Sequence, residues 1–271
     1  MSQIKPPFGQ HFLHDRNLLA LIVNSADLTP GDTVLEVGVG TGKLTEAILE
    51  TGASVIGVEI DRSLADRLED EFSGVRTFRL VRGDILKVPW DELLVSGRRT
   101  ILMGNLPYSV STQVIFRVLE HRSRILRAVF LMQWEVGRRL TAHPGTKEYG
   151  ILAVTTQLFG RPKLVRKIPP DVFLPPPKVD SALMRWDLSP DSLFPLTDWN
   201  FAMKVIRASF GKRRKTLVNS LSSGIDGLRK EDLSAILKEM EILHTIRAEG
   251  LEVSQFAELS DRVLDVVKGG H

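Results

Sequence analysis

The sequence predicts an α/β domain built on a parallel sheet, followed by a smaller all-helical domain. Residues 33–61 read as a buried strand, a glycine-rich turn, a helix and a second buried strand. Further apolar runs of strand length follow as far as residue 188. The composition then shifts at Ser189-Pro190, and apolar residues recur at helical spacing beyond it. We therefore predict a sheet domain at residues 1–188 and a helical domain at residues 189–271.

Composition narrows the classes of protein that the chain can belong to. With 43% hydrophobic and 25% charged residues among 271, it has the profile of a soluble globular protein. The absence of cysteine excludes disulfides, thiolate metal sites and a cysteine nucleophile. The six histidines lack metal-ligand spacing, so we expect no metal. No apolar run has membrane-spanning length and no leader is visible, so we expect a cytoplasmic protein without a membrane partner.

Basic residues are unevenly distributed, although the formal charge is only +3. The segment from Arg207 to Lys215 contains five basic residues and no acid. Smaller clusters occur at Arg98-Arg99, Arg122-Arg124-Arg127, Arg138-Arg139 and Arg161-Lys163-Arg166-Lys167. One such cluster is usually a solvated surface, but several on a near-neutral chain favour a polyanionic partner, which points to nucleic acid.

The N-terminal part begins with an arm and a helix. Two prolines exclude a helix before residue 8, and residues 8–13 read as a hydrophobic arm that packs on the domain. Residues 15–26 then form an amphipathic pattern with Asp15 as its N-cap.

The strand–turn–helix–strand segment is typical of a nucleotide-binding βαβ unit. Its glycine turn starts at Gly38, and an acid, Glu59, follows 21 residues later at the end of the second strand. The dinucleotide fingerprint fails because Lys43 stands where a third glycine is required, and there is no phosphate-cradling P-loop. A cofactor without a pyrophosphate fits better. We expect S-adenosylmethionine, with its amino-acid portion near the glycine turn and its ribose hydroxyls on Glu59.

Two further strands are expected to end on polar residues. After a helix at 64–72, a strand at 77–85 ends on Gly83-Asp84, where a carboxylate can accept from the amino group of a bound adenine. The next strand, at 100–103, leads into Gly104-Asn105-Leu106-Pro107-Tyr108 and a helix. A carboxamide and an aromatic at the carboxyl edge of a sheet suit a flat aromatic amine, although a plain strand-to-helix turn has the same sequence features.

The remaining chain alternates strands, a helix and a stiff loop before the helical domain. We predict a strand at 125–134, a helix at 150–159, and an antiparallel pair of strands at 164–168 and 181–188. The proline-rich loop between them carries Phe173, either as a core anchor or as a presented aromatic; we favour the second because the prolines stiffen the loop. Helices are expected at 199–210, 214–221, 230–240 and 254–267.

Six ordered motifs resemble one family, the small-subunit ribosomal RNA adenine dimethyltransferases. The motifs are Phe8-Gly9-Gln10-His11-Phe12-Leu13, residues 34–42 (VLEVGVGTG), Asn105-Leu106-Pro107-Tyr108, Tyr149-Gly150, residues 173–181 (FLPPPKVDS) and residues 210–217 (FGKRRKTL). The resemblance runs from about residue 5 to about residue 221. Three positions depart from the family's usual residues: His11 replaces Asn, Val39 replaces Pro and Trp134 replaces Lys.

The resemblance implies a class I, Rossmann-like S-adenosylmethionine methyltransferase fold with a seven-stranded, mostly parallel sheet. It also implies N6,N6-dimethylation of two adjacent adenines in the 3′-terminal hairpin of 16S rRNA, with a role in small-subunit biogenesis. Carried over by position, the cofactor site comprises Gln10, His11, Leu13, Gly38, Gly40, Glu59, Ile60, Asp84, Ile85 and Asn105. The implied partner is 16S rRNA or the immature small subunit, and we expect a monomer.

The expected mechanism assigns roles to the turn and to the two flanking aromatics. Asn105 and the Leu106 carbonyl accept from the adenine amino group, Pro107 fixes the turn, and Tyr108 and Phe173 sandwich the base after it leaves its stack. The segment Lys212-Arg213-Arg214-Lys215 contacts phosphates and sets register.

Three other functions share some of these features. An amino-methyltransferase acting on 23S rRNA, DNA or protein glutamine is the first, although the basic helical domain disfavours a protein substrate. The second is a non-enzymatic ribosome-assembly factor, and the complete Asn105–Tyr108 turn argues that catalysis is retained. The third is a dehydrogenase, against which Lys43 counts.

Overall fold

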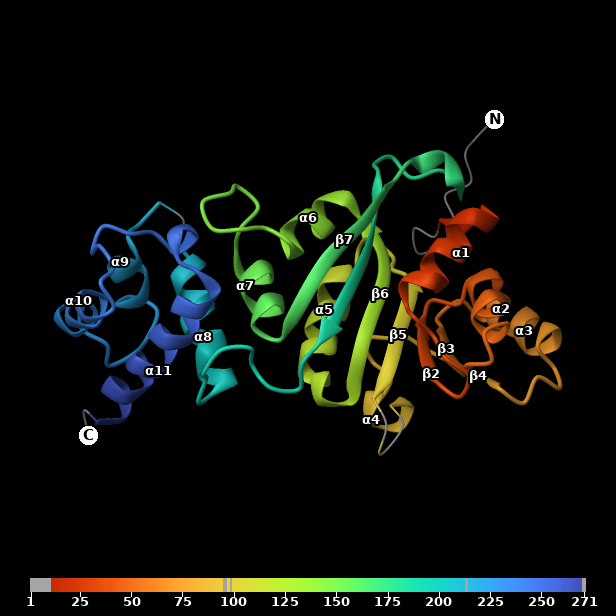
Figure 1. Ribbon diagram of the computed structural model, residues 1–271, viewed down its shortest axis with the longest axis horizontal. Coiled ribbons are helices and arrows are strands. Elements are labelled where there is room, and N and C mark those ends of the chain that lie inside the picture. The colour runs from red at the N-terminus through yellow and green to blue at the C-terminus, as the bar shows by residue number, and fades with distance from the viewer. Residues whose placement is uncertain (1–10, 95–96, 98, 213, 270–271) are drawn as a thin grey trace. The chain divides into compact units, whose positions relative to one another are not determined.

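The computed structural model describes residues 11–94, 97, 99–212 and 214–269 (Figure 1). The chain divides into two compact units, Met1–Gly137 with Arg161–Pro190 and Arg138–Gly160 with Asp191–His271. The second boundary lies close to the composition shift at Ser189-Pro190. Residues 138–160, however, were expected in the sheet domain and group with the helical unit. The reason is that helix α7 (Ile151–Leu158) buries its apolar side chains against helices from the C-terminal part.

The first unit is organised by a seven-stranded sheet in the order β4-β3-β2-β5-β6-β9-β7. Its strands are β2 (Thr33–Val37), β3 (Ser54–Glu59), β4 (Phe78–Arg82), β5 (Thr100–Asn105), β6 (Ile125–Gln133), β7 (Gly160–Ile168) and β9 (Ser181–Leu188). The five strands from β4 to β6 are parallel neighbours, and β9 runs antiparallel to β6. The expected mostly parallel sheet is confirmed. Because parallel strands end at one edge, the ends of β2, β3 and β5 come together there.

Short helices connect these strands. They are α1 (Arg16–Ser25), α2 (Lys43–Leu49), α3 (Arg62–Glu71), α4 (Trp90–Leu93), α5 (Ser111–Glu120) and the 3₁₀ turn η2 (Arg122–Arg124). Asp15 caps α1, as expected, by accepting from the Leu18 amide at 2.7 Å. Asp61 caps α3 in the same way through two amides. Helix α6 (Trp134–Leu140) follows β6 directly and runs across the division between the units.

A two-stranded ribbon joins the N-terminal arm to the proline-rich loop. Strand β1 (Phe12–Leu13) pairs antiparallel with β8 (Phe173–Leu174), which follows the 3₁₀ turn η3 (Pro170–Val172). Leu13 and Phe173 are both buried in the core that α1 and α2 form with the sheet. The described part of the arm, residues 11–13, therefore packs on the domain and reaches the edge where the strands end; residues 8–10 of the predicted arm fall outside the described residues.

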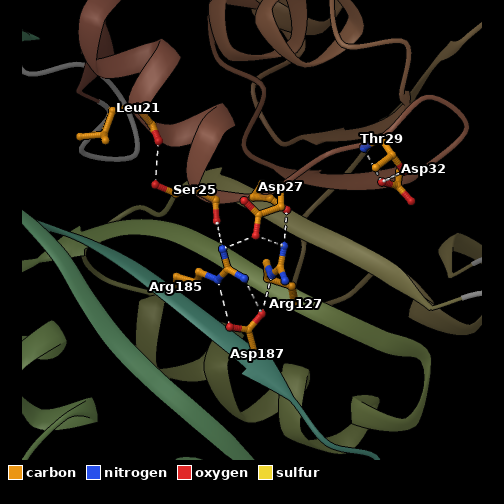
Figure 2. Close-up of polar contacts among 9 residues, drawn as sticks. Leu21, Ser25, Asp27, Thr29, Asp32, Arg127, Arg185 and Asp187 are labelled. Carbon is orange, nitrogen blue, oxygen red and sulfur yellow. Dashed lines mark hydrogen bonds and ion pairs between the residues drawn. The ribbon is translucent and has the colours of Figure 1, made fainter.

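A cluster of two arginines and two aspartates fixes the end of α1 to the sheet (Figure 2). Arg127 Nη1 on β6 donates to the Ala26 carbonyl at 2.6 Å, and Arg185 Nη1 on β9 donates to the Ser25 carbonyl at 3.2 Å. Asp27 and Asp187 each pair with both arginines. Cations near the C-terminal carbonyls of a helix interact favourably with the negative end of its dipole. The cluster thereby sets the position of α1 and of the arm that precedes it.

The second unit consists of α7, α8 (Trp199–Phe210), α9 (Leu217–Leu221), α10 (Lys230–Glu239), the 3₁₀ turn η4 (Ala248–Gly250) and α11 (Val253–Gly269). Helix α11 packs on α7, α8 and α10. Within this unit the Tyr149 hydroxyl donates to the Leu251 carbonyl at 2.8 Å, and burial raises the pKa of Tyr149. The four C-terminal helices predicted from the sequence are present, and α9 begins three residues later than expected, after its N-cap Thr216.

Candidate functional site

The turn after β5 is built by close backbone contact with β2. A Cβ atom on Gly104 would lie 2.4 Å from the Val37 carbonyl oxygen, so no other residue fits there without moving the strands. The Leu106 amide donates to the Leu131 carbonyl of β6 at 2.9 Å. These contacts hold residues 104–108 against the strand ends, so that the turn is positioned by the sheet itself.

The Asn105 side chain is held by the N-terminal arm. Its Nδ2 donates to the His11 carbonyl at 2.6 Å. With the amide nitrogen occupied in this way, Oδ1 is the atom that can accept from an incoming amino group. The arm thus orients the carboxamide as the predicted acceptor role requires.

A cavity of about 90 Å³ lies between this turn, the glycine turn and the arm. Gly38 and Gly40 adopt φ of 75° and 61°, which favour glycine, and they let the turn after β2 curve around the cavity. Seven of the residues predicted to bind cofactor line it, namely His11, Leu13, Gly38, Gly40, Glu59, Ile60 and Asn105. All four residues of the predicted acceptor turn line it as well, namely Asn105, Leu106, Pro107 and Tyr108.

Glu59, at the end of β3, is 2% exposed and faces the cavity. Its Oε2 accepts from the Gly40 amide at 2.8 Å and its Oε1 from the Asp61 amide at 2.9 Å. Each carboxylate oxygen can accept more than one hydrogen bond, so a pair of ribose hydroxyls can be added to this arrangement.

Glu36 also lines the cavity and was not among the predicted site residues. It is fully buried on β2; its Oε2 accepts from the Thr45 hydroxyl at 2.5 Å, and its Oε1 has no partner among the described residues. Burial, with a contribution from Glu59, raises the pKa of Glu36 to about 8 in spite of the Thr45 hydrogen bond. The signal in the sequence was an acid within an otherwise apolar buried strand (Thr-Val-Leu-Glu-Val).

The site residues fit the methyl donor that the sequence suggested. S-adenosylmethionine carries an ammonium and a sulfonium, and the cavity offers the buried, unpartnered oxygen of Glu36 together with Glu59. Gly38 lines the cavity, and a Cβ atom there would approach only the Asn105 carbonyl, at 4.0 Å, so this part of the turn leaves room for the amino-acid portion of the ligand. A cationic ligand would satisfy Glu36 Oε1, which otherwise costs free energy as an unpaired buried acceptor.

Tyr108, the last residue of the acceptor turn, contacts β9. Its hydroxyl is 2.8 Å from Ser181 Oγ, and its ring centroid is 5.5 Å from that of His11, with the planes tilted by 36°. Partial burial raises the pKa of the Tyr108 phenol. His11 Nδ1 is 2.7 Å from the Pro175 carbonyl. The imidazole therefore ties the arm to the proline-rich loop, and the residue's carbonyl holds Asn105.

The burial of Phe173 contradicts the prediction that this side chain is presented to a base. Its side chain is 2% exposed and packs in the core with Leu13, its neighbour across the β1–β8 ribbon. The next residue, Leu174, is 66% exposed, so strand alternation turns Leu174 outward and Phe173 inward. The prolines stiffen the loop, and the buried Phe173 side chain attaches this loop to the core. In this arrangement Phe173 cannot stack on a base.

Two of the predicted cofactor residues lie elsewhere. Asp84 and Ile85 are not part of the cavity lining; the Asp84 carboxylate accepts from the Leu86 amide at 2.9 Å in the loop after β4. That loop is joined to the site through the Gly83 amide, which donates to the Glu59 carbonyl at 2.8 Å. Gln10 falls outside the described residues.

The predicted RNA-binding segment forms the connection between α8 and α9 in the helical unit. Lys212, Arg214 and Lys215 are exposed, and Lys212 Nζ donates to Ser223 Oγ at 2.9 Å. Arg213 falls outside the described residues.

Comparison with known families decides between the remaining functions. The sequence profile described as "Ribosomal RNA adenine dimethylase" matches residues 1–264. The chain belongs to the ribosomal RNA adenine dimethylase family. It is therefore an rRNA adenine methyltransferase that uses S-adenosylmethionine. The dehydrogenase alternative is excluded.

Relatives of this adenine dimethylase and solved structures agree with the assignment. Proteins named "Ribosomal RNA small subunit methyltransferase A" are 39% identical in Pelotomaculum thermopropionicum, over 95% of this chain and 90% of the relative, and 40% identical in Syntrophotalea carbinolica, over 96% of each. A dimethyladenosine transferase from Plasmodium falciparum matches with a TM-score of 0.79 and 25% identity, over 92% of this chain and 96% of that one. The 23S rRNA methyltransferase ErmE matches with a TM-score of 0.71 and 25% identity, over 93% and 99%. The fold is thus shared by enzymes named for different rRNAs.

Two further observations concern membranes and metals. Within the described ranges, no helix is both long and apolar enough to cross a membrane. In the same part of the chain, no three His, Asp or Glu side chains gather as a metal ion would require.

Proposed function

We propose that this adenine dimethylase transfers methyl groups to the N6 amines of two adjacent adenines in the 3′-terminal hairpin of 16S rRNA, in the immature small subunit. The relatives are named for the small subunit, and the profile is named for adenine dimethylation. The observation that carries the proposal is the Asn105 carboxamide, whose Nδ2 is held by the arm while Oδ1 is left to accept.

The acceptor turn would position the amine for attack. The N6 lone pair is delocalised into the ring, so the amine is a weak nucleophile that gains most from orientation. Asn105 Oδ1 and the Leu106 carbonyl would accept the two N6 hydrogens, which leaves the lone pair facing the cofactor side of the cavity. Orientation of this kind can contribute several kcal/mol, of the roughly 7–11 kcal/mol that ideal proximity provides.

When bound, S-adenosylmethionine supplies an electrophilic methyl carbon. Its sulfur would take the carbon–sulfur electron pair as the leaving group when the methyl carbon is transferred to N6. The N6 proton leaves afterwards to water, so no side chain has to act as a pre-ionised base. Tyr108 would stack on one face of the base, which contributes on the order of 1–3 kcal/mol. Glu59 would hold the ribose hydroxyls, and Glu36 would face the cationic part of the ligand.

Asn105→Ala tests the acceptor role directly. We expect methyl transfer to fall by at least about a hundred-fold, as for removal of one preorganised catalytic hydrogen bond, while cofactor and RNA binding persist. Transfer of labelled methyl groups to unmodified 30S subunits measures the first quantity and equilibrium binding the second. Mapping of the label to N6-dimethyladenine in the 3′-terminal hairpin would support the substrate assignment. Near-normal transfer in the variant would rule out the proposed role of Asn105.

We also propose that the enzyme works as a cytoplasmic monomer. A monomer is sufficient because the residues of the cavity all come from one chain, and the cytoplasm is where small subunits of bacteria such as the matched relatives assemble. Light scattering at working concentration tests the oligomeric state, and a dimer mass would contradict it.

A further inference from the structure

The basic residues of the two edge strands differ in how many of them lack an ion-pair partner. On β4, Arg82 is neutralised by Asp66 and Glu69, each at 2.6 Å. On β7 the sequence from Gly160 to Ile168 contains four basic residues and no acid. Among the described residues, the exposed side chains of Arg161 and Lys163 have neither a hydrogen-bond nor an ion-pair partner. Among the described residues, the β7 strand therefore carries more exposed cations without a partner than β4, which carries one, Arg79.

The exposed face of β7 combines charge with apolar surface. Residues at alternate positions of a strand share a face, and along β7 these are Arg161, Lys163, Val165 and Lys167, all exposed. Val165 is 40% exposed between the cations. A stripe of basic residues along one face is the electrostatic footprint of a nucleic-acid-binding surface, and an aromatic side chain beside it would add a stacking platform for single-stranded bases.

A series of contacts past Trp134 connects this face of β7 with the acceptor turn. The Tyr108 hydroxyl contacts Ser181, which pairs with Gln133 across β6 and β9. One residue further on, the Trp134 amide donates to the Asp180 carbonyl at 3.0 Å. The Asp180 carboxylate binds Lys167 Nζ at 2.7 Å.

Trp134 itself is half-buried, and the Lys167 ammonium lies 5.3 Å from the centre of its ring. A cation at this distance is attracted to the indole face and fixes the ring. The exposed part of the indole is then a rigid aromatic surface between Tyr108 and the cations of β7.

We propose that Trp134 and the exposed face of β7 form a track for single-stranded RNA next to the target adenines. A base that flanks the target stacks on Trp134, and the phosphates that follow contact Lys163 and Arg161. The proposal rests on the proposed function, since it takes RNA as the substrate. It adds a binding surface in the sheet unit, separate from the Lys212–Lys215 segment of the helical unit.

Paired double variants test the charges. Arg161→Ala with Lys163→Ala removes the track, and Arg76→Ala with Arg79→Ala removes two exposed cations at the opposite edge of the same sheet. Binding is measured by anisotropy with the target hairpin, with and without a single-stranded extension, over a range of salt. We expect the track variant to bind the extended RNA about ten-fold more weakly at 0.1 M salt, with a salt slope smaller by about 1.4, the contribution of two phosphates on a single strand. The control variant should bind like the wild type.

Variants of Trp134 test the stacking. Trp90 and Trp186 are 1% and 4% exposed, but Trp199 of the helical unit is half-buried like Trp134. Quenching is therefore measured in a Trp199→Phe background, where RNA should quench chiefly Trp134. We expect quenching in this background and its loss when Trp134→Phe is added, with affinity retained. Trp134→Ala should bind about five- to 150-fold more weakly, from the free energy of one stacked base. Circular dichroism of each variant excludes unfolding as the cause.

The outcomes separate this inference from the proposed function. Equal affinities and slopes for the track and control variants would overturn the track, and the charges would then serve only to keep an edge strand from pairing with another chain. Track-dependent binding without methyl transfer by the wild type would support the track and contradict the proposed function. No binding of any RNA by the wild type would overturn both.

Discussion

At the scale of single residues, the site contains a buried acid whose ionisation is unfavourable. Glu36 is fully buried with one carboxylate oxygen unpartnered, and its pKa is raised to about 8. Between about pH 4.5 and 8 the folded protein holds a proton that the unfolded chain has released. The free energy of unfolding therefore falls as pH rises through this window, by at most about 1.4 kcal/mol per pH unit.

Glu36→Gln should remove this dependence in the cofactor-free protein. The amide cannot ionise, so we expect the variant to gain stability relative to the wild type as pH rises from 5 to 9. Denaturant unfolding at several pH values measures the difference, and Glu50→Gln, at an exposed position just after α2, is the control. Parallel curves for wild type and Glu36→Gln would mean that Glu36 is already ionised at neutral pH.

Phe173 makes a second prediction at this scale, because it is part of the core and not of the base-binding surface. Phe173→Ala should lower the free energy of unfolding by about 3–5 kcal/mol, the usual cost of a large cavity. Leu174→Ala, one residue further on and 66% exposed, should change it by less than about 0.5 kcal/mol. Denaturant titration measures both. Unchanged stability in Phe173→Ala, with lost RNA binding, would restore the presented-aromatic interpretation.

At the scale of elements, α1 is attached to the sheet by charges as well as by its apolar face. Burial alone would raise the pKa of Asp187, but hydrogen bonds from Arg185 and Arg127 outweigh it and lower that pKa. The stabilisation is therefore complete above the unfolded-state pKa, near 4, and is lost as pH falls through the lower folded-state value.

Asp187→Asn should lower the free energy of unfolding by about 1.5–3 kcal/mol at neutral pH, the range for hydrogen bonds to charged groups. The variant should also lose part of the acid sensitivity of the wild type below pH 4. Thermal unfolding at pH 7 and pH 3 measures both effects. Asp191→Asn, an exposed site beyond β9, is the control. A stability loss that stays the same at pH 7 and pH 3 would mean that Asp187 is not the titrating group.

Elements were predictable from the sequence where their signals are local. The glycine turn with Glu59, the Asp15 cap and the apolar strands need only neighbouring residues, and the structure has them where expected. The assignment of α7 to the helical unit was not predictable, because a helix that is buried on most sides does not reveal which partner covers it. The orientation of Phe173 depended on a two-residue ribbon with the arm 160 residues away, and no periodicity reports such a pairing.

At the scale of the whole molecule, we expect different residues to bind the cofactor and the RNA phosphates. All residues that line the cavity belong to the sheet unit, whereas Lys212 and Lys215 belong to the helical unit. Phosphate contacts contribute affinity that depends on salt but not on base sequence. Substitutions in the α8–α9 connection should therefore affect RNA binding without changing cofactor binding.

Lys212→Ala with Lys215→Ala should weaken binding of target and non-target hairpins to a similar degree, about ten-fold at 0.1 M salt, and reduce the salt slope by about 1.4–1.8. Lys230→Ala with Lys238→Ala, two exposed cations of α10, is the matched control. Cofactor affinity, measured by calorimetry, should be the same in all three proteins. Because these lysines and the β7 track belong to different units, combining the two double variants should give additive losses of binding free energy. A combined loss no larger than either alone would mean that the two surfaces do not contact RNA at the same time.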